Sequence, residues 1–362
     1  MDSQLIKLSH KEILKIDRDY EKIAQTVKLV YVNDQMPGFQ RVKKGKGFLY
    51  LDGNKKLSDP AVLERIRKLV IPPAWTNVWI CKFGNGHIQV TGYDVRNRKQ
   101  YRYHPLWNAA RSETKYHRIY AFGKVLPAIR LRIEEDLSLR NLCQQKVLAT
   151  VISLMERTYI RIGNEDYEKL YGSYGITTLK DNHVTITGTR LKFSFTGKKN
   201  VPHDITLKNK RLARVIKQCR DIPGKELFQY YDDNGNRQGI DSGMVNDYIK
   251  EAAGADFTAK DFRTWAGTLN LLRCLKSMGE AVSDSEIKRN IVAALDEVSR
   301  KLGNTRTVCR KYYVHPELIK LYEDHNLKQY LDELDDIEEP DQITGLTKDE
   351  KVLMKILKAT HA

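Results

Sequence analysis

The chain has 362 residues, of which 41% are hydrophobic and 30% are charged, so it is long enough for two domains with cores of their own. Its formal net charge of +16 at pH 7 favours a polyanionic partner, most commonly nucleic acid. No run of 18 apolar residues and no signal-peptide pattern occurs, which excludes a membrane-spanning helix and makes the cytoplasm the expected location.

The first third of the chain has the pattern of short strands joined by turns. A strand is predicted over Gly47–Leu51, where it ends at an Asp-Gly-Asn turn signal. A short helix is predicted over 61–69, and two further strands over 78–81 and 87–91. We therefore expect a small β-rich domain in this region.

A further strand is predicted over Gln100–His104. It places Tyr101 and Tyr103 on one face and Arg102 on the other. Basic residues flank it, and aromatic side chains interleaved with cations suit contact with the backbone or bases of a nucleic acid. A half-buried edge strand without a ligand has the same pattern, so this segment alone leaves both interpretations open.

After Pro105 the chain becomes mostly helical, with one small β region. Apolar residues at helical spacing predict a helix over 144–157. Two hairpins are predicted, over 176–187 and over 190–207, the second with its tip at Gly197-Lys198-Lys199-Asn200. Later helices are predicted over 211–220, 242–253, 258–275 and 284–302, the last ended by Gly303.

The end of the chain reverses the sign of the charge. Residues 332–341 are acidic, with no Lys or Arg between Lys328 and Lys348. We expect a solvated acidic face that can dock on a basic surface. A final short amphipathic helix is predicted over 345–362.

The segment after the helix 284–302 brings Tyr312 and Tyr313 directly behind Arg310 and Lys311. A phenol has a pKa of about 10, so it attacks at neutral pH only when cations surround the group that it attacks. Tyrosine, cations and a phosphodiester together indicate an enzyme that bonds itself covalently to DNA. Two packing tyrosines beside solvated cations give the same short pattern, so the segment needs support from the rest of the chain.

Transfer of a phosphoryl group without a metal needs several positive donors and an acid for the leaving oxygen. Arg161 after a helix, Lys198 at a hairpin tip and Arg263 in the first turn of a helix occur in that order, ahead of Asn304 and Tyr313. The five cysteines are scattered without zinc spacing, and there is no phosphate-binding loop or acidic metal cluster. No metal and no nucleotide cofactor are therefore expected.

Several ordered blocks together are far more specific than any single motif. They cover residues 47–51, 71–80, 98–105, 161–164, 261–265 and 302–316. With these blocks the chain resembles the type IB DNA topoisomerases of the compact poxvirus and bacterial kind, over nearly its whole length.

The resemblance selects the nucleophile between the two tyrosines. Tyr313, and not Tyr312, keeps the family's spacing after Gly303-Asn304; it would attack the scissile phosphate, form a 3′-phosphotyrosyl link and expel the 5′-hydroxyl. Poxvirus members carry histidine at the position of Asn304, whereas related bacterial enzymes carry asparagine. An amide can donate a hydrogen bond to a phosphate oxygen but cannot shuttle a proton, so Asn304 is expected to stabilise the transition state without an acid–base role.

The resemblance also implies roles for the cations. Arg161 and Arg263 match the two arginines that hold the nonbridging oxygens, for which the fork of an arginine is suited. Lys198 matches the lysine that protonates the leaving 5′-oxygen, and Lys199 is its nearest rival. The expected DNA contacts outside the reacting group are Tyr101, Tyr103, Tyr167, Lys260, Arg310 and Lys311.

The fold implied by the resemblance is α+β. It has a β-rich DNA-binding domain (1–106), a mostly helical catalytic domain with a three-stranded sheet (107–330), and an acidic tail with a short helix (331–362). The chain would act as a monomer that clamps double-stranded DNA, at the bacterial nucleoid or, for a viral protein, in the virion or at the site of viral replication. The bond is exchanged rather than hydrolysed, so no ATP is needed, and Mg²⁺ would stimulate turnover only by screening the product DNA.

Two other classes of protein remain as alternatives. A tyrosine recombinase shares the chemistry and the catalytic fold, but it would need a four-chain complex and usually a helical clamping domain, against which the strand-rich 47–104 region argues. A noncatalytic basic DNA-binding protein would show no covalent adduct.

Overall fold

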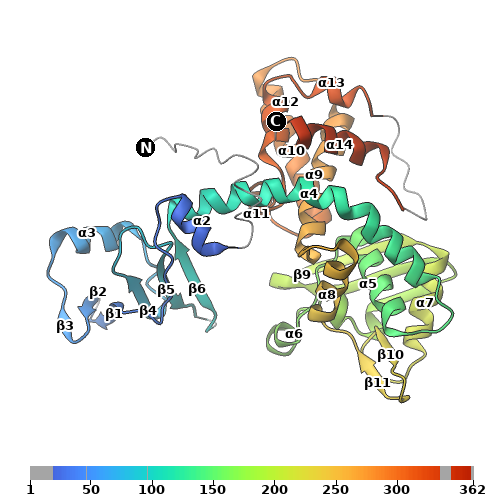
Figure 1. Ribbon diagram of the computed structural model, residues 1–362, viewed down its shortest axis with the longest axis horizontal. Coiled ribbons are helices and arrows are strands. Elements are labelled where there is room, and N and C mark those ends of the chain that lie inside the picture. Colours follow the sequence, from blue (N-terminus) through green and yellow to red (C-terminus); the bar gives the residue numbers. More distant parts are fainter. Residues whose placement is uncertain (1–18, 46, 96, 335–343, 360–362) are drawn as a thin grey trace. The chain divides into compact units, whose positions relative to one another are not determined.

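The structure is a computed structural model that describes residues 19–45, 47–95, 97–334 and 344–359 (Figure 1). The side chains of residues 112–117 and of Tyr167 are outside the described part, as is most of the acidic run 332–341. Within the described residues, no helix is both long and apolar enough to cross a membrane.

The chain divides into two compact units, Met1–Arg118 and Ile119–Ala362. The division falls inside the helix α4 (Pro105–Leu137), beyond the boundary expected at residue 106. The limits of the three predicted domains therefore stay a prediction.

The first unit is built on a six-stranded antiparallel sheet with the order β3-β2-β1-β4-β5-β6. Its strands are β1 (Gly38–Lys44), β2 (Gly47–Asp52), β3 (Lys55–Lys56), β4 (Thr76–Cys81), β5 (Ile88–Tyr93) and β6 (Lys99–Tyr103). The helix α3 (Pro60–Lys68) is capped by Asp59, whose carboxylate accepts a hydrogen bond from the N–H of Ala61 at 2.8 Å. It buries Ile66 against Val78, Ile80 and Val90 of the sheet. The strands and the helix predicted for this region are confirmed.

A second small core lies beside this sheet. The helix α2 (Tyr20–Thr26) buries Ile23 and Ala24 against Trp107 in the first turn of α4. Tyr101 and Tyr103 on β6 stack with ring centroids 5.8 Å apart and an interplanar angle of 9°. The two tyrosines therefore share a face, as the alternation of β6 predicts.

The second unit is mostly helical and has one continuous hydrophobic core. Its helices after α4 are α5 (Gln144–Thr158), α6 (Glu165–Tyr171), α7 (Lys210–Arg220), α8 (Ser242–Ala253), α9 (Ala259–Met278), α10 (Asp284–Leu302), α11 (Arg306–Tyr312), α12 (Pro316–Glu323), α13 (Lys328–Leu331) and α14 (Lys348–Ala359). A short two-stranded ribbon pairs β10 (Gln229–Tyr231) with β11 (Arg237–Gly239). The predicted α+β fold is confirmed.

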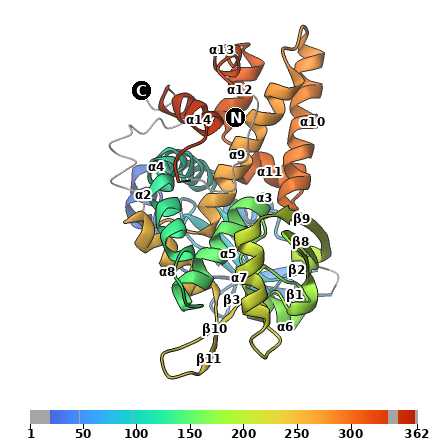
Figure 2. The ribbon, with the colours of Figure 1, turned by 90° about the vertical axis from the view of Figure 1, so that its right-hand side faces the viewer.

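The three-stranded sheet of this unit has the antiparallel order β7-β8-β9, with β7 (Val184–Thr187), β8 (Arg190–Gly197) and β9 (Val201–Lys208). Alternate residues of β8 are buried, because successive side chains of a strand point to opposite faces. The helices α5 and α7 cover the sheet (Figure 2). The β8–β9 hairpin closes through the tight turn η3 (Lys198–Asn200), as predicted.

The first predicted hairpin, over 176–187, is wrong in its first strand, whereas its second strand is confirmed as β7. Residues Ile176–Thr178 form a 3-10 turn, η1, and the strand β7 begins only at Val184. The β-branched residues of this turn favour a strand, but tertiary contacts override that preference. The N–H of Ile176 donates to the carbonyl of Arg161 at 2.7 Å, and a Cβ on Gly175 would lie 2.6 Å from the Cα of Gly163.

The predicted C-terminal helix is present as α14, and it is integrated into the core of the second unit. Val352, Leu353, Ile356 and Leu357 are buried. Glu350 accepts hydrogen bonds from Arg130 at 2.7 Å and from the indole of Trp265 at 3.0 Å. The helix α14 is thereby joined to α4 and α9.

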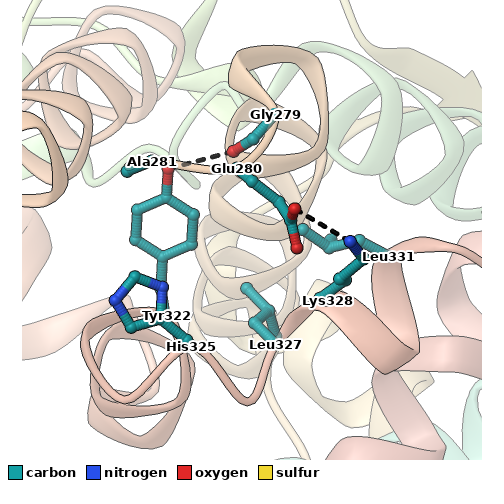
Figure 3. A pocket seen from close by; sticks show the side chains of 8 residues that line it. All are labelled: Gly279, Glu280, Ala281, Tyr322, His325, Leu327, Lys328 and Leu331. Carbon is teal, nitrogen blue, oxygen red and sulfur yellow. Dashed lines mark hydrogen bonds and ion pairs between the residues drawn. The ribbon is translucent and has the colours of Figure 1, made fainter. Parts of the chain in front are cut away.

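A small pocket lies where the turn between α9 and α10 meets α12 and α13 (Figure 3). The hydroxyl of Tyr322 donates to the carbonyl of Gly279 at 3.1 Å, and Lys328 pairs with Glu280 at 2.8 Å (Figure 3). None of the eight lining residues belongs to the site predicted from the sequence. The contacts are those of a packed helix junction.

Candidate active site

Arg263 lies near the start of α9, which a capping box of Thr258 and Asp261 fixes. Its side chain is almost fully buried, with 6% of the residue's surface exposed. One guanidinium nitrogen donates to the carbonyl of Tyr159, and the other donates to the carbonyl of Leu302 at 2.8 Å. Leu302 is the last residue of α10, where the terminal carbonyls have no partner inside the helix. Arg263 therefore joins the end of α5 to the end of α10.

Arg161 approaches the same helix end from the loop after α5. That helix stops at Tyr159, which has the left-handed φ of 58°. The guanidinium of Arg161 donates to the carbonyl of Gly303 at 2.9 Å and to Oδ1 of Asn304. The predicted residues Arg161, Arg263 and Asn304 are therefore brought together at the end of α10.

Among the described residues, the two arginines have no counter-ion. Burial, and then the charge of Arg263, lowers the pKa of Arg161 to about 10. Burial also lowers the pKa of Arg263. In the part of the chain that the structure describes, no carboxylate pairs with either guanidinium, and the neutral oxygens of the peptide chain and of Asn304 accept their hydrogen bonds. A guanidinium stays charged in proteins, and a buried charge without a partner is costly, so this pair is suited to bind an anion.

Tyr313 lies directly after α11 and is half-buried beside the arginine pair. The guanidinium carbon of Arg263 is 5.1 Å from the centroid of its ring. The backbone of Tyr313 is held closely by α9, because a Cβ on Gly267 would lie 2.3 Å from the carbonyl oxygen of Tyr313. Tyr312, in contrast, is 48% exposed, with Lys311 over its ring. The geometry thus separates the two tyrosines and places Tyr313 with the arginines.

Asn304 has a side-chain donor that no described residue pairs with. Its Oδ1 accepts from Arg161, while its Nδ2 is buried and has no hydrogen-bond partner among the described residues. A buried polar group is normally satisfied. A phosphate oxygen beside the two guanidinium groups would supply the missing acceptor.

Lys198 lies at the tip of the β8–β9 hairpin and is exposed. Its rival Lys199 is also exposed and has the left-handed φ of 63°. The contacts at this tip do not show which of the two lysines is the general acid. The role of Lys198 therefore stays a prediction.

The predicted DNA contacts are spread over both units. Tyr101 and Tyr103 lie in the first unit. In the second, Lys260 is exposed in the first turn of α9, and Arg310 and Lys311 are exposed on α11. Tyr167 lies on α6, and its side chain is outside the described part. The DNA-binding role of each of these residues stays a prediction.

The sequence reasoning missed His203 on β9. Its ring stacks on Phe195 with centroids 4.9 Å apart. Its ring lies against Gly303, whose carbonyl accepts the hydrogen bond from Arg161. Burial and then the charges of Arg161 and Arg263 lower its pKa. The alternation of β9, which puts His203 on the same face as Ile205 and Leu207, was the available signal.

Comparisons with known proteins agree with this architecture. Residues 104–339 match the family model described as the catalytic core of eukaryotic DNA topoisomerase I. Residues 47–94 match the N-terminal domain of bacterial DNA topoisomerase IB.

Individual viral proteins are also similar to the chain. DNA topoisomerase 1B of Acanthamoeba polyphaga mimivirus is 33% identical over 299 residues, which cover 80% of this chain and 89% of that protein. DNA topoisomerase I of Monkeypox virus and DNA topoisomerase 1B of Vaccinia virus (strain Copenhagen) are each 22% identical over 240 residues, covering 65% of this chain and 72% of those proteins.

The fold and these matches define the protein's class as that of the DNA topoisomerases, isomerases that act on DNA. The chain belongs to the type IB DNA topoisomerase family. Both the predicted resemblance and the predicted type IB activity are confirmed. Members of this family are generally independent of ATP and of metal ions.

Proposed function

We propose that Tyr313 is the nucleophile of this type IB topoisomerase. Its phenolic oxygen forms a bond to the scissile phosphorus while the bond from phosphorus to the 5′-oxygen breaks. The phenolic proton is released to solvent, and Lys198 donates a proton to the departing 5′-oxygen. The product is a 3′-phosphotyrosyl link and a free 5′-hydroxyl. The free strand rotates and releases torsion, and attack of the same hydroxyl reseals the strand.

The other site residues stabilise the transition state in this proposal. Arg161 and Arg263 exchange their carbonyl partners for the two nonbridging phosphate oxygens, and the Nδ2 of Asn304 donates to one of these oxygens. Preorganised donors of this kind are usually the largest single contribution to catalysis. The observation that carries the proposal is the buried arginine pair beside Tyr313, which has no carboxylate partner within the described residues.

We propose further that one chain acts alone and that both units contact the same DNA duplex as a clamp. Tyr101 and Tyr103 contact the DNA from the first unit, and Tyr167, Lys260, Arg310 and Lys311 contact it from the second. Because each bond broken is replaced by another phosphoester, the reaction needs no ATP, and any stimulation by Mg²⁺ comes from screening of the product DNA. The site of action is where the duplex is, at the nucleoid of a bacterium or the replication site of a virus.

The test is to map the covalent adduct. Supercoiled plasmid is mixed with the enzyme without ATP, the reaction is trapped by denaturation, and the DNA-linked peptide is sequenced. We expect the adduct on Tyr313 and on a 3′ phosphate. Tyr312→Phe is the matched control and should keep the adduct, whereas Tyr313→Phe should lose it. An adduct on Tyr312, or on a 5′ phosphate, contradicts the assignment.

A further inference from the structure

The ring of His203 lies between two glycines, each of which directly precedes a site residue of the proposed reaction. A Cβ placed on Gly197 would lie 2.6 Å from Nε2 of His203, and one placed on Gly303 would lie 2.5 Å from its Cε1. Real Cβ atoms do not approach other atoms so closely, so only glycine permits this packing on either side of the ring. Gly197 precedes Lys198, and Gly303 precedes Asn304.

The position of the ring is itself fixed from the sheet. His203 pairs with Phe195 across the β8–β9 register, and the two rings stack with an interplanar angle of 17°. On the α10 side, the carbonyl of Gly303 accepts the hydrogen bond from Arg161. One side chain thus contacts both the base of the hairpin tip and the turn that the arginine pair holds.

We propose that His203 is a positioning residue for the cleavage reaction, whose ring fixes the Lys198 hairpin tip against the Gly303–Asn304 turn. The inference rests on the proposed function, since it acts through Lys198 as the general acid. Removing the ring opens a space between Gly197 and Gly303, in which the tip can move relative to the arginine pair. A displacement of about 1 Å of a catalytic group can slow a reaction about 10²-fold.

The first experiment asks whether His203 acts through the leaving group. The rate of a single cleavage event is measured on two substrates, an ordinary duplex and one in which sulfur replaces the bridging 5′-oxygen of the scissile phosphate. A thiolate leaves without a proton because a thiol is far more acidic than an alcohol, so the second substrate does not need the general acid. We expect His203→Ala to cleave the ordinary duplex about 10-fold or more slowly and to recover most of that loss on the sulfur substrate. Lys198→Ala should show the same pattern as His203→Ala, a slow cleavage of the ordinary duplex and a recovery on the sulfur substrate.

A matched variant tests the contact itself. Gly197→Ala introduces a Cβ against the His203 ring, at a backbone φ of −93° that alanine adopts without strain. We expect Gly197→Ala to slow cleavage in the wild-type background and to add little in the His203→Ala background, because contacting residues are not additive. Gly239→Ala is the control, since a Cβ there meets nothing within 4 Å, and it should leave the rate unchanged.

The outcomes separate this inference from the proposed function. If the wild-type enzyme forms no adduct on Tyr313, the proposed function fails. If that adduct forms but His203→Ala cleaves both substrates at the wild-type rate, only the role of His203 is overturned. The role of His203 is also overturned if His203→Ala slows cleavage equally on the two substrates. The same holds if the rate losses of Gly197→Ala and His203→Ala multiply in the double variant. The melting temperature and the DNA affinity of each variant, which we expect to be close to wild type, distinguish a misplaced hairpin tip from a misfolded protein.

Discussion

Two arginine sites in the second unit are equally buried but have opposite electrostatics. Arg130 is 4% exposed and Arg263 is 6% exposed. Burial by itself would lower the pKa of Arg130, but the charges and hydrogen bonds of Glu156 and Glu350 raise it above its ordinary value. At Arg263 burial outweighs the opposing effects of Tyr313 and Cys309, and the pKa is lowered.

The difference separates a structural arginine from one that is available to a ligand. The charge of Arg130 is neutralised inside the protein by Glu156 and Glu350. Through Glu350 these ion pairs attach α14 to the core, although α14 lies after residue 339, where the family match ends. Within the described residues, neutral oxygens accept the hydrogen bonds of Arg161 and Arg263, and a phosphate can replace them without separating an ion pair. A buried guanidinium is therefore an indicator of function only when its partners are also known.

The largest expected effect tests the structural side of this comparison. Arg130→Met leaves the buried Glu350 and the partly buried Glu156 without their cation, and breaking a buried pair by removing one partner costs about 3–5 kcal/mol. We expect the free energy of unfolding, measured in urea, to fall by this amount. The rate of DNA cleavage, measured well below the new melting temperature, should change little.

The control for this variant is an exposed ion pair in the same unit. Arg300 is 73% exposed and pairs with Glu297 one turn earlier on α10. Arg300→Met should change the unfolding free energy by less than about 1 kcal/mol. A loss of cleavage by Arg130→Met in a folded protein would contradict the division into structural and functional arginines.

The next effect tests the functional side. We expect Arg263→Ala to slow adduct formation by about 10²–10³-fold, the usual loss when one preorganised donor is removed. Its effect on the melting temperature should be small, because the relief of a buried charge opposes the loss of the hydrogen bonds to Tyr159 and Leu302. The measurement is the rate of covalent adduct formation in a single turnover.

Arg273, ten residues later on the same helix, is the matched control. It pairs with Asp349 at 2.6 Å. Arg273→Ala should therefore lower the melting temperature and leave the cleavage rate near that of the wild type. The reverse pattern for Arg263 and Arg273 would show that the pairing of an arginine does not indicate its role.

The acid dependence of stability sharpens the comparison further. Burial by itself raises the pKa of Glu350, but the hydrogen bonds and charge of Arg130 outweigh this effect and lower it. A carboxyl whose pKa is lower in the folded state stabilises the protein fully above its unfolded pKa of about 4.3, and this contribution is lost as the pH falls through the folded pKa. We expect Glu350→Gln to be less stable than wild type at pH 7 and to lose less stability on acidification.

The measurement is a series of urea unfolding curves from pH 7 downwards. Glu165→Gln is the control, because Glu165 is 68% exposed in its pair with Lys169 and should contribute little. Parallel pH curves for wild type and Glu350→Gln would show that Glu350 is not the carboxylate that the network stabilises.

Local patterns predicted the parts of the site that depend on neighbouring residues. The alternation of residues 190–207 with a Gly-Lys-Lys-Asn tip predicted the β8–β9 hairpin, and Gly303 after a periodic segment predicted the end of α10. The choice of Tyr313 over Tyr312 came from the spacing of a family pattern. All of these signals lie within a few residues of the feature that they predict.

The remaining parts depend on contacts between distant residues. The pairing of Arg130 with Glu350 joins positions 220 residues apart, and periodicity carries no information on such a pair. The turn η1 was predicted as a strand because its β-branched residues favour one, whereas the hydrogen bond from Ile176 to Arg161 decides its conformation. His203 was missed because its neighbours Gly197 and Gly303 come from different elements.

The smallest expected effect asks whether the arginine pair binds an anion without any DNA. Inorganic sulfate presents tetrahedral oxygens like those of a phosphodiester, and a ligand that binds only the folded state stabilises it by RT ln(1 + [L]/Kd), about 1.4 kcal/mol at ten times Kd. We expect sulfate to raise the melting temperature of the wild type more than that of Arg161→Ala. Sulfate also stabilises proteins generally by exclusion from their surface, so only the difference between the two proteins, corrected with chloride at equal ionic strength, measures the site. Equal sulfate responses would mean that the carbonyls of Leu302 and Gly303 hold the guanidinium groups too firmly for an isolated anion to displace them, and that the pair is available only to a phosphate positioned by the rest of the duplex.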